Sequence, residues 1–330
     1  MSGKRVMAGM RTTGALHIGH YFGVLKNWVH LQDSYDCFFG AMDWHALTDA
    51  YKRASEIPSF AREIVAEWVA FGIDPNRATL FVQSMVPEHL ELTMIFANLT
   101  PMGWLERVPT WKDAEEELKI NDAHNLGRFT YPVLQTADIA IYRGELVPVG
   151  QDQVAHLEIS REIVRRFNGI YKTKVLPEPK PLLTATPAVT GTDGRKMSKS
   201  YGNVVPLIAE EKAVVKVCNK MVTDPKRVRR EDPGDPEVCP VFGFHKLVSS
   251  DEDRKWVVEG CTTAGIGCGD CKARLAQNLN ILMEKPREIK KELLNNPKAL
   301  DSIIAEGSQK ARVEAQKTLK EVRSAMGFWV

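Results

Sequence analysis

Two histidines stand close together in a glycine-rich segment near the start of the chain, Gly9-Met-Arg-Thr-Thr-Gly-Ala-Leu-His17-Ile-Gly19-His20. On the first turn of a helix the imidazoles of His17 and His20 share one face, from which they could donate hydrogen bonds to a phosphate. The glycines allow close backbone approach, and the helix N-terminus supplies free N–H groups and a positive dipole. The segment therefore suits a phosphate site, although a structural glycine turn with two chance histidines would give the same pattern.

A second polar segment, Gly191-Thr-Asp-Gly-Arg-Lys196-Met197-Ser198-Lys199-Ser200, combines cationic and hydroxyl side chains with glycines. Such a loop suits closure over a triphosphate, because lysine and arginine form charge-assisted hydrogen bonds to phosphate oxygens. The competing interpretation is a solvated surface loop, which most charge runs are.

Cysteines concentrate in one short stretch of the second half. The stretch holds Cys239, Cys261, Cys268 and Cys271. In a chain of 330 residues without secretion signals, such a group indicates a metal site more than disulfides. Four thiolates can bind one tetrahedral zinc ion or the four corners of a [4Fe–4S] cluster. Only Cys268 and Cys271 are tightly spaced, so zinc, the cluster and free or disulfide-bonded thiols all stay open.

Short apolar runs that alternate with helical patterns must position these residues. The runs predict strands at 5–10, 37–42, 78–83 and 145–149. Strands that alternate with helices indicate βαβ units and a mainly parallel sheet, whose ligands bind beyond the carboxyl ends of the strands. The second half is almost wholly helical and includes helices at 270–283, 286–294 and 297–325. We therefore expect an α/β fold, with a Rossmann-like parallel-sheet domain that binds nucleotide and an α-helical C-terminal domain.

The composition is that of a folded globular protein, with 44% apolar and 26% charged residues. A length of 330 residues fits two domains. The formal net charge of +2 gives no global signal for a polyanion partner, so any nucleic-acid surface must be local. The start lacks the apolar core of a secretory signal, and no apolar run is long enough to cross a bilayer. We expect a soluble, cytoplasmic protein with no membrane partner.

The His-x-Gly-His segment and the Lys-Met-Ser-Lys-Ser segment together resemble the class I aminoacyl-tRNA synthetases. A narrower resemblance, to the tryptophanyl-tRNA synthetase family, covers essentially the whole chain. It rests on stretches such as AMDWHALT, FVQSMVPEH, YPVLQTADI, LVPVGQDQVAHLEIS and GTDGRKMSKSYGN. The tyrosyl-tRNA synthetases share this fold and are the close alternative. A non-catalytic paralogue is the third possibility, and the intact histidines and lysines of the two segments argue against it.

The resemblance implies a two-step reaction. Tryptophan carboxylate attacks the α-phosphate of ATP, bound with Mg²⁺, and the aminoacyl group then passes to tRNA(Trp). His17 and His20 would stabilise charge at the α-phosphate, while Lys196 and Lys199 would hold the departing pyrophosphate. Such catalysis is positioning and electrostatic stabilisation, with no side-chain nucleophile. The residues that the resemblance places near ATP are Gly9, Met10, Arg11, Gly19, His20, Gly150, Gln151, Asp152, Lys196, Met197, Ser198, Lys199 and Ser200, of which the turn 150–152 matches a ribose site.

For tryptophan, the resemblance implies a pocket. Its residues are Met42, His45, Tyr131, Gln135, Asp138 and Gln153. Tyr131 and Gln153 would bind the α-ammonium, and Asp138 would accept the indole N–H. Tyr131, Gln135 and Asp138 share one helical face at i, i+4 and i+7, so one helix could present all three. Without the resemblance, Asp138 would more readily be an ordinary buried cap or surface acid, and His45 is equally consistent with a structural histidine.

In the helical half, the resemblance implies a [4Fe–4S] cluster on the four cysteines, as in a subset of bacterial tryptophanyl-tRNA synthetases, with zinc as the alternative. A locally basic segment lies at 216–230, and a solvated helix end would explain it equally simply. Its cations that would meet tRNA phosphates are Lys226, Arg227, Arg229 and Arg230.

The resemblance also implies a homodimer and a division of labour along the chain. We expect a catalytic domain at 1–190, which binds ATP and tryptophan. The remainder, 191–330, would carry the Lys-Met-Ser-Lys-Ser loop and the helices that bind the tRNA anticodon, with the last helix able to pack back on the catalytic domain.

Overall fold

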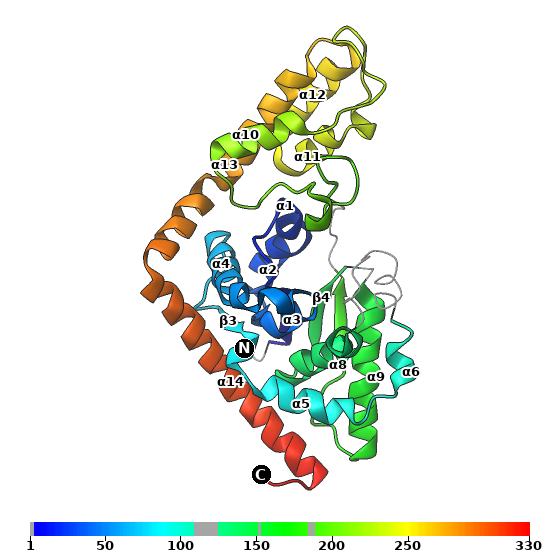
Figure 1. Cartoon of the computed structure of the whole chain (residues 1–330), viewed down its shortest axis with the longest axis vertical. Helices are drawn as coiled ribbons and strands as arrows, with labels where there is room; N and C mark the ends of the chain where they lie inside the picture. Colours follow the sequence, from blue (N-terminus) through cyan, green and yellow to red (C-terminus); the bar gives the residue numbers. More distant parts are fainter. Residues whose placement is uncertain (1–2, 109–124, 151–152, 184–188) are drawn as a thin grey trace. The chain divides into compact units, whose positions relative to one another are not determined.

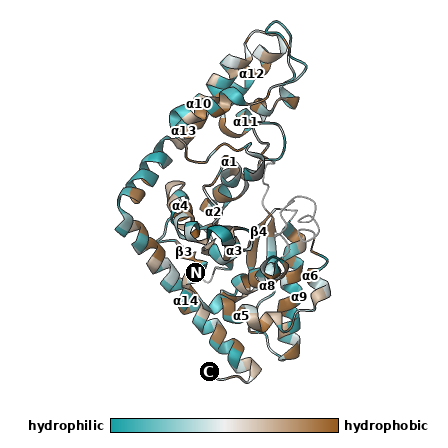
Figure 2. Ribbon diagram, viewed as in Figure 1, coloured by the Kyte–Doolittle hydropathy of each residue, from teal (hydrophilic) through white to brown (hydrophobic). Residues whose placement is uncertain are grey.

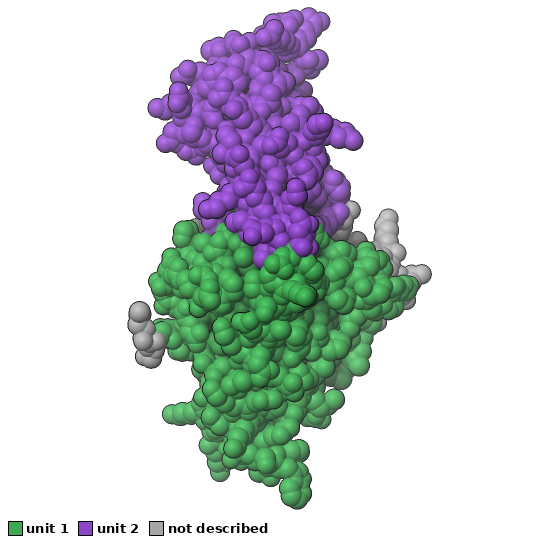
Figure 3. Space-filling model, turned by 90° about the vertical axis from the view of Figure 1, so that its left-hand side faces the viewer, with its two compact units in different colours: residues 1–14, 29–185, 296–330 green, residues 15–28, 186–295 purple. Residues whose placement is uncertain are grey.

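The computed structural model describes residues 3–108, 125–150, 153–183 and 189–330. The chain forms two compact units, which Figure 3 colours separately. Unit 1 comprises residues 1–14, 29–185 and 296–330, and unit 2 comprises residues 15–28 and 186–295. Neither unit is a single stretch of sequence, so segments far apart in the chain build each one.

Unit 1 is built on a sheet of five parallel strands (Figure 1). They are β1 (Arg5–Arg11), β2 (Asp36–Met42), β3 (Ala78–Val82), β4 (Leu146–Val149) and β5 (Lys180–Leu183), in the order β3-β2-β1-β4-β5. The predicted α/β fold and its first four strands are confirmed, because strands covered on both faces read as continuous apolar runs. The sequence did not predict β5, which is short and contains Pro181. Proline is tolerated there because β5 is an edge strand.

Helices cover the sheet of unit 1. The main ones are α3 (Asp43–Ala50), α4 (Ile57–Ala70), α5 (Glu88–Ala97), α8 (Leu126–Ile141), α9 (Val154–Ile170) and α14 (Pro297–Met326). Helix α8 packs on α5 and α9, and its buried Val133 and Ala137 join the main hydrophobic core with Phe81 and Phe96. Asn125 caps α8 by accepting a hydrogen bond from the backbone N–H of Arg128 at 2.9 Å. The position of α8 is therefore fixed at its start and along its apolar face.

The long helix α14 covers the edge strand β3 (Figure 1). A Cβ on Gly307 would lie 1.8 Å from the carbonyl oxygen of Leu80, so only glycine allows the two backbones to come this close. The hydroxyl of Ser308 accepts a hydrogen bond from the N–H of Val82 at 3.1 Å. Apolar and polar residues mix along α14 in Figure 2, and its buried residues include Ala311, whereas Lys310 is exposed. The helix thus protects a strand edge that would otherwise be open to pairing.

Unit 2 is helical apart from its loops. Its longer helices are α10 (Glu211–Lys220), α11 (Pro240–Val248), α12 (Asp251–Thr262) and α13 (Cys268–Asn295). The predicted break near Pro286 is wrong, because α13 continues through this proline. Packing of the buried Leu275, Leu279 and Met283 side chains on neighbouring helices outweighs the lost backbone hydrogen bond. No helix in the described ranges combines the length and the apolar character that a membrane crossing requires.

Candidate functional site

A cavity of about 260 Å³ in unit 1 lies toward the carboxyl ends of β1 and β2. The strand order reverses at β1, since β2 and β3 lie on one side of it and β4 and β5 on the other. Such a crevice is the usual ligand site of an open α/β sheet. The lining residues are Met7, Ala8, Gly9, Arg11, Met42, His45, Tyr131, Gln135, Asp138, Ile139, Val147 and Gln153. The structure therefore brings all six residues predicted for tryptophan to one cavity, together with Gly9 and Arg11.

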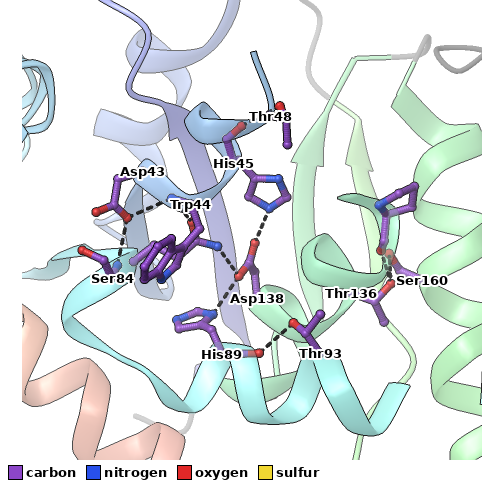
Figure 4. Close-up of polar contacts among 12 residues, drawn as sticks. Asp43, Trp44, His45, Thr48, Ser84, His89, Thr93, Thr136, Asp138 and Ser160 are labelled. Carbon is purple, nitrogen blue, oxygen red and sulfur yellow. Dashed lines mark hydrogen bonds and ion pairs between the residues drawn. The ribbon is translucent and has the colours of Figure 1, made fainter. Parts of the chain in front are cut away.

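Asp138 is the most enclosed polar group of this cavity, with 3% of its surface exposed. Its Oδ1 accepts hydrogen bonds from Nε2 of Gln83 and Nδ1 of His89, each at 2.7 Å. Its Oδ2 lies 2.8 Å from Nε2 of His45. Figure 4 shows the carboxylate between the two imidazoles. Asp138 is thus held by donors from three elements other than its own helix.

Two opposing effects set the charge of Asp138. Burial would raise the pKa of its carboxyl group, because an apolar environment disfavours the charged form. The hydrogen bonds and charges of His45 and His89 outweigh burial and hold the pKa of Asp138 well below its usual range. The group is therefore an ionised, acceptor-only carboxylate at neutral pH, which suits an N–H donor such as that of indole.

Three residues of this network have no role assigned by the sequence. Gln83 and His89 lie behind Asp138, and the hydroxyl of Tyr142 is 2.7 Å from Nε2 of His89. All three are fully buried. The available signal is that Gln83 is a polar residue directly after an apolar strand, whereas His89 lies in the helix that follows. A buried polar group needs a partner, but the sequence does not say that the partner is Asp138.

Met42 reaches the cavity because two glycines make room for it. Gly9 of β1 pairs with Gly40 of β2 in the sheet register. A Cβ at either glycine would lie 2.4 Å from the terminal methyl carbon of Met42. Gly9 therefore has a packing role beside any contact of its backbone with a ligand.

The residues predicted to lie near ATP in unit 1 have different environments. Met10 is buried within β1, where it pairs with Ala41 of β2. The guanidinium of Arg11 is half-exposed and forms an ion pair with Asp49 at 2.5 Å. The carbonyl of Gly150 accepts a hydrogen bond from the N–H of Gln153 at 3.0 Å, next to the start of α9. The predicted Gln151 and Asp152 lie outside the described residues.

His17 and His20 lie together in unit 2, where His17 caps the short helix α1 (Ile18–His20). Their ring centroids are 3.7 Å apart, and the backbone N–H of His17 donates to Nδ1 of His20 at 3.1 Å. In neutral His20 the proton therefore sits on Nε2, which is a donor. This turn is anchored by the N–H of Ile18, which donates to the carbonyl of Val205 at 2.9 Å.

Both histidines are neutral at pH 7. Burial lowers the pKa of His17 to about 4, and the charge of Lys199 lowers it further. Burial lowers the pKa of His20 to about 3, with smaller contributions from His17 and Lys199. Among the described residues, Nδ1 of His17 is buried without a hydrogen-bond partner. The pair can therefore act on a phosphate by N–H donation and not as fixed cations.

Asn203 organises the predicted Lys-Met-Ser-Lys-Ser loop. Its buried side chain donates to Oδ1 of Asp193 at 2.8 Å and to the carbonyl of Lys196 at 3.1 Å, and it accepts from the N–H of Ser198 at 2.8 Å. Gly191 packs against it, because a Cβ there would lie 2.2 Å from Nδ2 of Asn203. Asn203 closes the stretch GTDGRKMSKSYGN, and its side-chain role is not evident from the sequence. One amide thus fixes the backbone that carries both lysines.

Within unit 2 the loop and the histidines are close neighbours. A Cβ on Gly19 would lie 2.9 Å from Nδ1 of His17 and 3.3 Å from the sulfur of Met197. Met197 is buried, whereas Lys196 and Lys199 are exposed. The buried methionine therefore anchors a loop whose two cationic side chains face solvent. The side chain of Ser200 is not among those described.

The four clustered cysteines line one small cavity of about 20 Å³ in unit 2. Burial and the three neighbouring thiols raise the pKa of Cys271 to about 12. Nη1 of the buried Arg227 lies 3.8 Å from the sulfur of Cys261. In the part of the chain that the structure describes, no group of three His, Cys, Asp or Glu side chains is arranged to hold a metal ion. The cysteines are thus brought together, but not in the geometry of an ion site.

The basic segment of unit 2 divides into exposed and buried cations. Lys226, Arg229 and Arg230 are exposed. Arg227 is buried, and its Nη2 donates to the carbonyls of Arg230 at 2.9 Å and Ile266 at 2.7 Å. Arg227 therefore stabilises the loop near the cysteines, and of the four cations predicted to meet tRNA only the other three are exposed.

Comparisons with known proteins agree with this geometry. The model of the family "tRNA synthetases class I (W and Y)" matches residues 3–284. The tryptophan–tRNA ligase of Thermotoga maritima is 49% identical, covering 98% of this chain and 99% of the relative, and that of Aquifex aeolicus is 43% identical, covering 98% and 100%. The crystal structure of tryptophanyl-tRNA synthetase from Campylobacter jejuni, complexed with ADP and tryptophan, is 34% identical, with a TM-score of 0.90 and coverage of 98% and 100%. The chain therefore belongs to the tryptophan–tRNA ligase family of class I tRNA synthetases.

Proposed function

We propose that this chain activates L-tryptophan with ATP, giving tryptophanyl-adenylate and pyrophosphate, and then transfers the tryptophanyl group to tRNA(Trp). One observation carries the proposal: a cavity at the strand-order reversal gathers all six predicted tryptophan residues around the buried carboxylate of Asp138. Family membership supplies the reaction class.

Substrate recognition in the proposal assigns one group to each end of tryptophan. Asp138 accepts the indole N–H, and Tyr131 and Gln153 bind the α-ammonium. Met42 and the other apolar lining residues pack on the ring. A phenylalanine ring in this cavity offers no hydrogen-bond donor to Asp138, and a buried carboxylate left with an empty acceptor position disfavours the wrong substrate.

The activation step joins a carboxylate oxygen of tryptophan to the α-phosphorus of ATP and breaks the bond to the bridging oxygen of the β-phosphate. The bond electrons leave with pyrophosphate, which is held by Lys196 and Lys199. Neutral His17 and His20 donate hydrogen bonds to the phosphate oxygens on which charge accumulates. Mg²⁺ would bind together with ATP, through the phosphate oxygens, as it commonly does with nucleotides. The ribose contact that we expect from Gly150, Gln151 and Asp152 completes ATP binding.

Exchange of labelled pyrophosphate into ATP tests the activation step. We expect exchange with tryptophan and at most a trace with tyrosine. Exchange with tyrosine alone would support the tyrosyl alternative, and no exchange with either amino acid would leave a non-catalytic paralogue. Lys199→Ala should slow exchange, because pyrophosphate loses one charge-assisted contact.

We further propose that Cys239, Cys261, Cys268 and Cys271 bind a [4Fe–4S] cluster that stabilises the fold around them. The donor set suits it, because four thiols line one cavity. Nε of the buried Arg227 has no hydrogen-bond partner among the described residues, and a cation at this position would offset the negative charge of a cluster. The thiols must rotate outward to admit it, since the cavity is about 20 Å³. A cluster would serve structure, because the reaction is not redox.

Metal analysis after anaerobic purification tests this assignment. We expect about four irons and four inorganic sulfides per chain, with visible absorption that disappears in Cys271→Ser. Cys218→Ser, at a buried cysteine outside the group, should retain them. One zinc and no iron would establish the zinc alternative, and no metal at all would leave four free thiols.

The proposed functional division is 1–190 for ATP and tryptophan and 191–330 for the Lys-Met-Ser-Lys-Ser loop and tRNA, although α14 packs on β3 of unit 1. Exposed Lys226, Arg229 and Arg230 would meet tRNA phosphates.

We also propose a homodimer, supported by Leu90 and Met94, which are 41% and 65% exposed one turn apart on α5. The cytoplasmic location expected from the sequence stays a prediction.

A further inference from the structure

The two oxygens of Asp138 are used unequally. Oδ1 accepts two hydrogen bonds of 2.7 Å, from Gln83 and His89. Among the described residues, Oδ2 accepts one, from His45 at 2.8 Å. A carboxylate oxygen has two lone pairs, so Oδ1 is saturated and Oδ2 retains one acceptor position. Asp138 and His45 line the cavity, whereas Gln83 and His89 do not. The unused acceptor position is therefore on Oδ2, the oxygen hydrogen-bonded to the cavity-lining His45.

The amide of Gln83 can face Asp138 in one orientation only. Its Oε1 accepts a hydrogen bond from the backbone N–H of Trp44 at 3.1 Å, while its Nε2 donates to Asp138. A flipped amide would set its NH₂ against an N–H and its oxygen against a carboxylate. Because Gln83 is fully buried, no solvent can relieve either conflict. The backbone of Trp44 thus locks a donor onto Oδ1.

A second chain of contacts fixes His89. A carboxylate only accepts, so Nδ1 of His89 donates to Asp138, and Nε2 of the same ring lies at hydrogen-bond distance, 2.7 Å, from the hydroxyl of Tyr142. The ring of Tyr142 stacks on Phe38 with centroids 4.8 Å apart, and the ring of His89 stacks on Phe81 at 5.8 Å. His89 and Tyr142 are fully buried, so packing sets the ring orientation of His89.

We propose that Gln83 and His89, with Tyr142 behind them, are positioning residues for tryptophan specificity: they hold Oδ1 of Asp138 so that Oδ2 is aimed at the indole N–H. This inference rests on the proposed function and names three residues that do not touch the substrate. A fixed acceptor rejects a ligand that lacks the N–H, whereas a carboxylate free to turn away discriminates less.

An analogue of tryptophan isolates this role. In β-(3-benzothienyl)alanine a sulfur replaces the indole N–H, and the rest of the ring keeps its shape. We would measure kcat/KM for pyrophosphate exchange with each substrate and compare their ratio between enzymes. His89→Leu and Gln83→Met should each lower the preference for tryptophan roughly tenfold, the effect of one hydrogen bond to a charged group. His89→Asn, whose amide N–H can replace the Nδ1 donor, should retain most of it.

Thr93→Val is the matched control, because the Thr93 hydroxyl donates to the backbone carbonyl of His89 at 2.7 Å and not to the network. It should leave the ratio unchanged. If Gln83→Met and His89→Leu slow both substrates equally, with the ratio within about twofold of the wild type, the residues are merely structural and the inference fails. Gln83→Met decides alone if His89→Leu does not fold, since methionine keeps the length of glutamine. A wild type that shows no exchange with tryptophan refutes the proposed function itself.

Discussion

Burial raises the pKa of a carboxyl group and lowers the pKa of a histidine, so it favours the neutral form of both kinds of group in this enzyme. Asp138 is buried yet ionised, because His45 and His89 lower its pKa more than burial raises it. His17 and His20 are partly buried and neutral, because burial and nearby positive charge both lower their pKa. The first group is therefore a permanent acceptor and the other two are donors that carry no charge to neutralise.

The two histidines should make stability depend on pH. Their folded pKa values, about 4 and about 3, lie below the ordinary value of 6.5. As the pH falls below 6.5, the unfolded chain therefore binds protons at these histidines before the folded chain does. The free energy of unfolding is at its full value above pH 6.5 and falls as the pH drops toward the folded pKa values, by at most about 1.4 kcal/mol per pH unit for each histidine. Urea unfolding between pH 7 and pH 5.5 measures this slope.

The double variant His17→Asn, His20→Asn should flatten that slope, and His30→Asn, at an exposed histidine, should not. An unchanged slope in the double variant would show that these two groups are not buried as described.

At the scale of elements, α8 and α14 do the main positioning in unit 1. Helix α8 presents Tyr131, Gln135 and Asp138 on one face, as the sequence predicts. Helix α14 joins the sheet from the far end of the chain, and its close approach depends on Gly307. The elements near the site are therefore held by contacts between segments distant in sequence.

Gly307→Ala should destabilise unit 1, because the new methyl group would meet the backbone of Leu80, which cannot move without disturbing β3. We expect a loss of about 1–3 kcal/mol in urea unfolding, typical of overpacking. Gly169→Ala in α9 is the control, since nothing lies within 4 Å of a Cβ there, and it should be neutral or stabilising. Equal stability of the two variants would contradict the described packing of α14.

The local sequence pattern predicts some features of the fold and the site and misses others. Apolar runs predict four strands, and helical spacing predicts the shared face of Tyr131, Gln135 and Asp138. Pro286 led to the wrong prediction of a helix break, because tertiary packing keeps α13 continuous across it. Gln83, His89 and Asn203 are missed because their roles depend on partners that only the folded chain brings near. The sequence predicts Arg227 at the surface, but it is buried, because its side chain donates to the carbonyls of Arg230 and Ile266.

At the scale of the whole molecule, each compact unit carries one part of the chemistry. Unit 1 holds the cavity with Asp138, and unit 2 holds the histidine pair, the lysine loop and the cysteines. The near-zero net charge of the chain conceals the local basic surface of unit 2.

The proposed homodimer predicts that Met94→Glu lowers the sedimentation coefficient toward that of a monomer, because a buried unpaired charge is costly at an interface. Ile281→Glu is a control of similar exposure, 62% against 65%, on α13. A wild type that sediments as a monomer, or a Met94→Glu variant that stays dimeric, would contradict this choice of interface.

Charging of tRNA is the most direct test of the central claim. Purified protein would be incubated with ATP, Mg²⁺, tRNA(Trp) and radiolabelled tryptophan, with tyrosine and tRNA(Tyr) in a parallel reaction. We predict that tryptophan is attached to tRNA(Trp) through an ester that mild base releases, and that Asp138→Asn abolishes most of this charging. Attachment of tyrosine instead, or of neither amino acid, would contradict the assignment of this chain as a tryptophan–tRNA ligase.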